Sequence, residues 1–148
     1  MRAVVTRVSE ASVTIDGQIH AKISKGFLVL LGIHTEDQMD DAQKLARKIC
    51  SMRIFSDESG QMKRGLSDVA GELLLVSQFT LYGDVRRGRR PEFLSAAKPA
   101  QAVPLYEAFI AACQQECPTV QTGVFGAMME VSSINDGPVT LILDTADF

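Results

Sequence analysis

The segment from Ser77 to Leu81 places hydroxyl and amide side chains directly after the apolar run Leu73 to Val76. A hydroxyl can act as a nucleophile when a base activates it. If Leu73 to Tyr82 is one extended strand, alternation puts the Gln78 amide and the Thr80 hydroxyl on the same face. The segment is a candidate catalytic site, and a half-buried strand with satisfied polar groups is the simpler alternative.

A second candidate segment runs from Asn135 to Thr140. Asn, Asp, Gly and Pro are the residues that turns favour, so Asn135 to Pro138 predicts a turn ahead of a final strand. A cis bond before Pro138 would give this turn a rigid backbone, although only about 5% of such bonds are cis in folded proteins.

Arg86, Arg87, Arg89 and Arg90 crowd around Gly88 just before Pro91, in a stretch without hydrophobic periodicity. Because arginine contacts to phosphate carry much of the affinity for nucleic acid, these four are candidates for nucleic-acid binding. Lys63 and Arg64 are candidates to extend the patch, and an ordinary solvated loop is the alternative.

His20 and His34 do not lie beside a candidate nucleophile in the sequence. A Ser-His-Asp relay remains an alternative, because triads assemble in space. Cys50, Cys113 and Cys117 are odd in number and lie in apolar or helical stretches, which favours free thiols over disulfides or a metal site. We expect neither a metal nor a cofactor.

The elements that must position these segments are short strands and two helices. Thr35 predicts a cap for an amphipathic helix over Glu36 to Ser51, and Pro104 predicts the first turn of a second helix that ends near Cys117. The predicted strands cover residues 3–8, 12–15, 27–31, 53–55, 73–76, 120–122, 128–131 and 139–143. This order predicts a single α+β domain over residues 1–148 with a mainly antiparallel sheet.

The composition narrows the function classes further. The chain has 148 residues, 46% of them hydrophobic, and a formal net charge of −3. No apolar run approaches the roughly 20 residues that span a bilayer, and the first residues lack the features of a secretory signal, so we expect a cytoplasmic protein without membrane contact. Because the net charge is negative, affinity for nucleic acid must come from a local patch.

Ser77-Gln78-Phe79-Thr80-Leu81 and Gly137-Pro138-Val139-Thr140 resemble the two signature segments of the D-aminoacyl-tRNA deacylase family. The resemblance extends to the opening residues Met1 to Val5, the apolar strand Gly26 to Gly32, Arg90-Pro91-x-Phe93 and the run Gly123 to Met129. Several matches in order over nearly the whole length make chance agreement improbable.

The resemblance implies a barrel-like α+β fold and a homodimer whose active sites lie at the subunit interface. It implies catalysis at Ser77, Gln78, Phe79 and Thr80, with the oxyanion bound by backbone N–H groups and with help from the 2′-hydroxyl of the terminal ribose. It implies that Gly137 and Pro138, joined by a cis bond, enter the partner's pocket and exclude L-amino acids. Candidate pocket-lining residues are Phe125, Met128 and Met129.

The expected reaction is hydrolysis of the ester of D-aminoacyl-tRNA, which makes tRNA the expected partner, and of glycine mischarged on a non-cognate tRNA such as tRNA-Ala, because glycine has no side chain to reject. Two other functions fit the same residues. One is a non-catalytic module that binds tRNA or the ribosome, and the other is a small-molecule esterase that ignores RNA.

Overall fold

A long first strand organises the sheet in the computed structural model, which describes residues 1–148. β1 (Arg2–Ile15) pairs antiparallel with β2 (Gln18–Ile23), β3 (Gly26–Gly32) and β8 (Glu130–Asp144). β3 continues in parallel to β6 (Glu72–Ser77), and β6 to β7 (Val120–Thr122). The sheet is therefore mixed, with antiparallel pairings in the majority.

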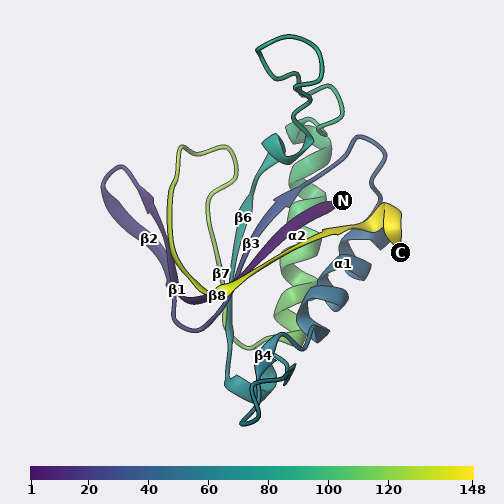
Figure 1. The fold of residues 1–148 in the computed structure, drawn as a ribbon. Coiled ribbons are helices and arrows are strands. Elements are labelled where there is room, and N and C mark those ends of the chain that lie inside the picture. Colours follow the sequence, from purple (N-terminus) through teal and green to yellow (C-terminus); the bar gives the residue numbers. More distant parts are fainter.

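Both long helices pack on one side of this sheet, where α1 (Met39–Ser51) and α2 (Pro99–Glu116) lie side by side (Figure 1). Buried residues of both helices, including Leu45, Ile49 and Phe109, share one core cluster with Val5 and Leu75 of the strands. A smaller cluster, centred on Val13 and Leu74, lies between the sheet and its β1–β2 hairpin. The expected α+β class with two principal helices is confirmed.

The first helix begins three residues later than predicted. Gln38 is its N-cap, and Asp41 completes a capping box, with the Asp41 carboxylate accepting from the Gln38 N–H at 2.8 Å. Asp37 cannot belong to the helix, because its carboxylate turns back to accept from the His34 N–H at 2.6 Å. The cap predicted at Thr35 is therefore wrong.

The second helix begins at Pro99, five residues before the predicted start at Pro104. Pro99 occupies the first turn, where a missing N–H costs nothing, and Pro104 lies inside the helix. The end at Glu116 agrees with the prediction.

The strand predicted over residues 73–76 corresponds to β6, which ends at Ser77. The longer strand considered over Leu73 to Tyr82 does not form, because Phe79–Tyr82 is the 3-10 helix η2. At the other segment, the turn predicted over Asn135 to Pro138 lies inside β8, which runs without a break from Glu130 to Asp144. Its register against β1 jumps between the pairs Val8–Asn135 and Thr6–Thr140, so the residues between form a bulge.

The remaining elements are small. β4 (Phe55–Ser56) and β5 (Met62–Arg64) make a two-stranded ribbon, and η1 (Ser67–Val69) and η3 (Thr145–Asp147) are single 3-10 turns. No helix is both long and apolar enough to cross a bilayer.

Candidate active site

The first candidate segment forms a tight turn at the end of the buried strand β6. The Gln78 N–H donates to the Leu31 carbonyl at 2.7 Å, which ends the pairing with β3, and the Leu81 N–H donates to the Gln78 carbonyl at 3.2 Å. The N–H groups of Phe79 and Thr80 precede the first bond of a 3-10 turn and so have no acceptor within it. Both residues are exposed.

The Gln78 amide and the Thr80 hydroxyl do meet, as the sequence predicted, but through the turn and not through strand alternation. The side-chain amide of Gln78 donates to the Thr80 Oγ1. No carboxylate or imidazole is hydrogen-bonded to either the Thr80 or the Ser77 hydroxyl. The turn therefore presents backbone donors and one amide, without a side chain that would act as a general base.

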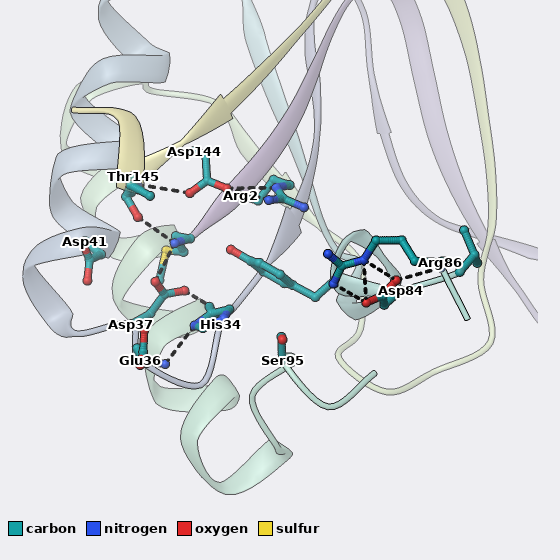
Figure 2. A pocket seen from close by; sticks show the side chains of 15 residues that line it. Arg2, His34, Glu36, Asp37, Asp41, Asp84, Arg86, Ser95, Asp144 and Thr145 are labelled. Atoms are coloured by element: carbon teal, nitrogen blue, oxygen red, sulfur yellow. Dashed lines mark hydrogen bonds and ion pairs between the residues drawn. The ribbon is translucent and has the colours of Figure 1, made fainter. Parts of the chain in front are cut away.

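Arg2, the first residue of β1, contacts this turn through its side chain. Its guanidinium donates to the Leu81 carbonyl at 3.0 Å, lies 4.8 Å from the centroid of the Tyr82 ring and forms an ion pair with Asp144 at 2.9 Å. Burial, with Asp37 and Asp144 nearby, raises the pKa of the Tyr82 phenol, so the ring is neutral. Figure 2 shows Arg2 held against Asp144 beside the cavity.

The second candidate segment is the bulge in β8, and Arg7 fixes it. Arg7 is only 8% exposed; its Nε donates to the Asp136 carbonyl at 3.0 Å and its Nη1 to the Ile54 carbonyl at 2.6 Å. On the other side of the bulge, the Val139 N–H donates to the Asn135 amide oxygen at 3.0 Å. The bulge is therefore held at both ends.

At the centre of the bulge, the peptide bond between Gly137 and Pro138 is cis, and Gly137 has a φ of +135°. A Cβ on Gly137 would lie 2.8 Å from the Val139 Cγ2 and 3.0 Å from the Arg7 Nη2, so this position needs glycine. The Pro138 ring is exposed.

Within a single chain, the turn after β6 and the bulge in β8 do not lie close together. Arg2 contacts the turn at Leu81 and Arg7 contacts the bulge at Asp136, and the five residue steps along β1 from Arg2 to Arg7 span roughly 16 Å at about 3.3 Å each. The two signatures thus lie at opposite ends of the first half of β1, too far apart to contact one aminoacyl group.

The candidate pocket-lining residues lie in the segment between β7 and β8. Phe125 is half-buried with its ring 5.9 Å from that of Tyr106, whereas Met128 is 91% exposed. Met129 packs on the smaller core, and its Sδ would be 2.6 Å from a Cβ on Gly123. The Gly123 N–H donates to the Leu75 carbonyl, so Met129 lies near the end of β6. Phe125 packs against the main core.

The four arginines lie on a loop that projects beyond the sheet and both helices (Figure 1). Arg86 forms an ion pair with Asp84, while Arg87, Arg89 and Arg90 have no hydrogen-bond or ion-pair partner. Lys63 and Arg64 lie in the β4–β5 ribbon at the other end of the molecule, so they do not extend this patch.

A cavity of about 790 Å³ lies between the base of this loop, the first strand and the start of α1. Of the site residues proposed from the sequence, only Arg86 lines this cavity. Its other lining residues include Tyr82 and, labelled in Figure 2, Arg2, His34 and Asp144. The sequence reasoning missed Arg2 and Arg7, whose side chains contact the two candidate segments. Arg7 carried a signal, because it shares the buried face of β1 with Ala3 and Val5, where a cation needs a specific partner.

Neither histidine is hydrogen-bonded to the Ser77 or Thr80 hydroxyl. The His34 Nδ1 accepts from the Glu36 N–H at 3.2 Å and its ring packs on Tyr82, while His20 is exposed on β2. Cys50, Cys113 and Cys117 are free thiols, and no group of three or more His, Cys, Asp or Glu side chains is placed to hold a metal ion.

Comparison with known proteins identifies relatives over almost the whole chain. A family model described as D-Tyr-tRNA(Tyr) deacylase matches residues 4–144. A D-aminoacyl-tRNA deacylase of Thermus aquaticus is 59% identical over 147 residues, which cover 99% of this chain and 97% of that protein. One from Cytophaga hutchinsonii is 55% identical, covering 98% and 97% of the two chains.

Solved structures agree with this similarity. A structure titled c-Myc DNA Unwinding Element Binding Protein superposes with a TM-score of 0.91 at 41% identity, covering 97% of this chain and 98% of that one. A structure titled as a probable eukaryotic D-amino acid tRNA deacylase has a TM-score of 0.84 at 14% identity, covering 96% and 97%, and at that identity it bears on the fold alone.

Proposed function

The chain belongs to the D-Tyr-tRNA(Tyr) deacylase family, and on that premise we propose that it hydrolyses the ester of D-aminoacyl-tRNA to free D-amino acid and tRNA. The observation that carries this function is the 59% identity, over nearly the full length of both chains, to a protein named as a D-aminoacyl-tRNA deacylase. Residues 1–148 act in this proposal as one deacylase domain, in the cytoplasm, where aminoacyl-tRNA is used.

The proposed chemistry is attack of water on the ester carbonyl carbon, followed by cleavage of its bond to the ribose oxygen, which takes up a proton. The N–H groups of Phe79 and Thr80, which have no acceptor within the turn, bind the oxyanion that develops on the carbonyl oxygen. The 2′-hydroxyl of the substrate's own ribose assists proton transfer. Ser77 and Gln78 shape the turn, and the hydrogen bond between Gln78 and Thr80 supports this division, since no base activates the Thr80 hydroxyl.

The proposed basis of chiral selection is steric. Gly137 and Pro138 of a second copy enter the pocket beside the turn and lie against the α-carbon of the amino acid, on the side where an L-residue carries its side chain. A D-residue presents only hydrogen there. The hydrogen bonds of Arg7 and Asn135 support this role, because they hold the backbone of the bulge in place. Gly137 and Pro138 can exclude an L side chain only if this backbone does not move when the side chain presses against it.

A homodimer is part of the proposal, because one chain holds its two signature segments roughly 16 Å apart along β1. β8 also pairs only with β1, so its outer edge is free, and it exposes the apolar side chains of Val131, Ile134, Leu141 and Ile142. Unpaired edges and exposed apolar side chains are features that a partner chain covers. Phe125, Met128 and Met129 would then line the pocket that the two copies enclose.

The steric account has a consequence for glycine, which has no side chain to clash with the wedge. Glycyl-tRNA, including glycine mischarged on tRNA-Ala, should therefore be hydrolysed. If glycyl esters survive enzyme concentrations that clear D-aminoacyl esters, selection does not work by exclusion at the α-carbon.

The experiment that tests the function is release of radiolabelled D-tyrosine from tRNA by the purified protein, followed at increasing salt. An esterase that ignores RNA would show little dependence of kcat/KM on salt, whereas an enzyme that binds phosphates loses affinity steeply. Binding of tRNA without turnover would instead support the non-catalytic module.

A further inference from the structure

The four arginines stand on a hairpin with a defined base, here called the basic arm (Asp84–Glu92). The Asp84 N–H donates to the Glu92 carbonyl at 2.8 Å, and the Glu92 N–H donates back to the Asp84 carbonyl at 3.0 Å. The hairpin reverses at Gly88, whose φ is +81°, and its tip extends beyond both helices (Figure 1).

The basic arm is attached directly to the catalytic turn. Phe93, the residue after the arm, packs edge to face on Phe79 with 5.0 Å between ring centroids. The chain that follows is fastened to the strand beside the turn, where the Ala97 N–H donates to the Ile33 carbonyl at 2.8 Å. The base of the arm is therefore held beside the turn at Phe79.

The four arginines differ in their surroundings. The Nε of Arg86 donates to both carboxylate oxygens of Asp84, at 2.9 and 3.0 Å, and the Arg86 backbone N–H donates to the same carboxylate at 2.8 Å. Figure 2 shows the Arg86 side chain folded back on Asp84. Its charge is compensated within the arm, and its hydrogen bonds hold the first side of the hairpin to the Asp84 carboxylate.

Arg87, Arg89 and Arg90 are exposed and have neither an ion-pair nor a hydrogen-bond partner. Three uncompensated guanidinium groups within four residues make a strong local positive field on a chain whose net charge is −3. Arginine forms paired hydrogen bonds with phosphate oxygens, so the charge and the geometry both fit a nucleic-acid backbone.

We propose that Arg87, Arg89 and Arg90 bind backbone phosphates of the tRNA away from the ester, while Arg86 is a positioning residue that holds the arm through Asp84. The inference rests on the proposed function, because it takes tRNA as the substrate. It implies that the arm sets the affinity for RNA and that the turn alone acts on the ester.

The test is the salt dependence of uncharged tRNA binding, measured between about 50 and 200 mM salt. Each of Arg87→Gln, Arg89→Gln and Arg90→Gln should weaken binding and reduce the slope of log K against log salt by about 0.7 to 0.9, the loss of one phosphate contact. Arg86→Gln should leave that slope unchanged. Arg53→Gln, an exposed arginine next to β4 at the far end of the molecule, is the matched control and should change nothing.

Unchanged slopes in all three variants, no binding by the wild type, or a reduction in Arg86→Gln equal to the others would each overturn the proposal. A second substrate separates this failure from failure of the proposed function. The D-tyrosyl ester of adenosine contains no phosphate. The Arg87→Gln, Arg89→Gln and Arg90→Gln variants should therefore hydrolyse it at the wild-type rate. If the wild type hydrolyses D-aminoacyl-tRNA while the slopes do not respond, only the role of the arm is wrong.

Discussion

At the scale of single residues, Thr80 decides which chemistry the turn performs. Its hydroxyl accepts a hydrogen bond from the Gln78 amide, and no base is bonded to it. We predict that Thr80→Ala keeps activity on D-tyrosyl-tRNA within about tenfold of wild type, roughly 1.4 kcal/mol of transition-state stabilisation. Single-turnover deacylation measures this, with Thr80→Ser as the control. A loss of several orders of magnitude in a folded variant would indicate covalent catalysis instead.

The ion pair in the basic arm has a measurable pH dependence. Hydrogen bonds from the Arg86 side chain and backbone lower the pKa of Asp84 to about 2, from an ordinary value of 3.8. Because the folded-state pKa is depressed, the stabilisation is fully present above the ordinary pKa and is lost as the pH falls through about 2.

Arg86→Gln should therefore return the pKa of Asp84 toward its ordinary value, since it removes the side-chain hydrogen bond from Arg86, the largest cause of the shift. Carbon NMR of the Asp84 carboxyl group during an acid titration reports this directly, and Asp57, whose pKa is lowered by Ser59, is an internal control that should not move. A wild-type Asp84 that titrates at its ordinary pKa would show that the ion pair does not persist in solution.

The sequence identified the segments that contact the substrate in the proposal. It did not identify the residues that fix those segments through hydrogen bonds. Ser77 to Thr80 and Gly137-Pro138 were recognisable because they resemble the two signature segments of a known family. Arg2 and Arg7 donate to the backbone carbonyls of Leu81 and Asp136. Because every residue has a backbone carbonyl, the sequence cannot identify which one accepts the hydrogen bond. Their roles needed the fold.

At the scale of elements, one glycine determines how closely β3 and β6 approach. A Cβ on Gly26 would lie 1.9 Å from the Glu72 carbonyl oxygen, and this backbone atom cannot move without breaking the parallel pairing. We predict that Gly26→Ala lowers the free energy of unfolding by about 3 kcal/mol or more. Urea unfolding measures the change. Gly65→Ala, where the nearest atom is 3.5 Å away, is the control, and equal stability of the two variants would contradict the prediction.

Element types were predictable and their boundaries near the site were not. Apolar periodicity gave both helices and most strands, because burial on one face is a local pattern. The strand predicted over residues 73–76 matches β6, but the turn over Phe79 to Tyr82 was not predicted, since its residues are strand-like and it begins at the bond from Gln78 to Leu31. The bulge in β8 was predicted as a turn for a related reason: its partner residues in β1 are distant in the sequence, as the pairs Val8–Asn135 and Thr6–Thr140 show.

At the scale of the whole molecule, the free edge of β8 is where assembly can be tested. Ile142 is 74% exposed on this strand. In the proposed homodimer, Ile142→Glu places a charge in an apolar interface, so we predict a folded monomer without deacylase activity. Sedimentation and deacylation assays measure both properties. Ile19→Glu, equally apolar and 66% exposed on β2, is the control. An active wild-type monomer would contradict the dimer.

The central claim is that the protein distinguishes D- from L-aminoacyl esters by excluding the L side chain. The most direct measurement is release of amino acid from matched D- and L-tyrosyl-tRNA by EDTA-treated protein. The account predicts rapid loss of the D-ester while the L-ester persists. Equal turnover of both esters would contradict the wedge at Gly137 and Pro138, and turnover of neither would contradict the deacylase function itself.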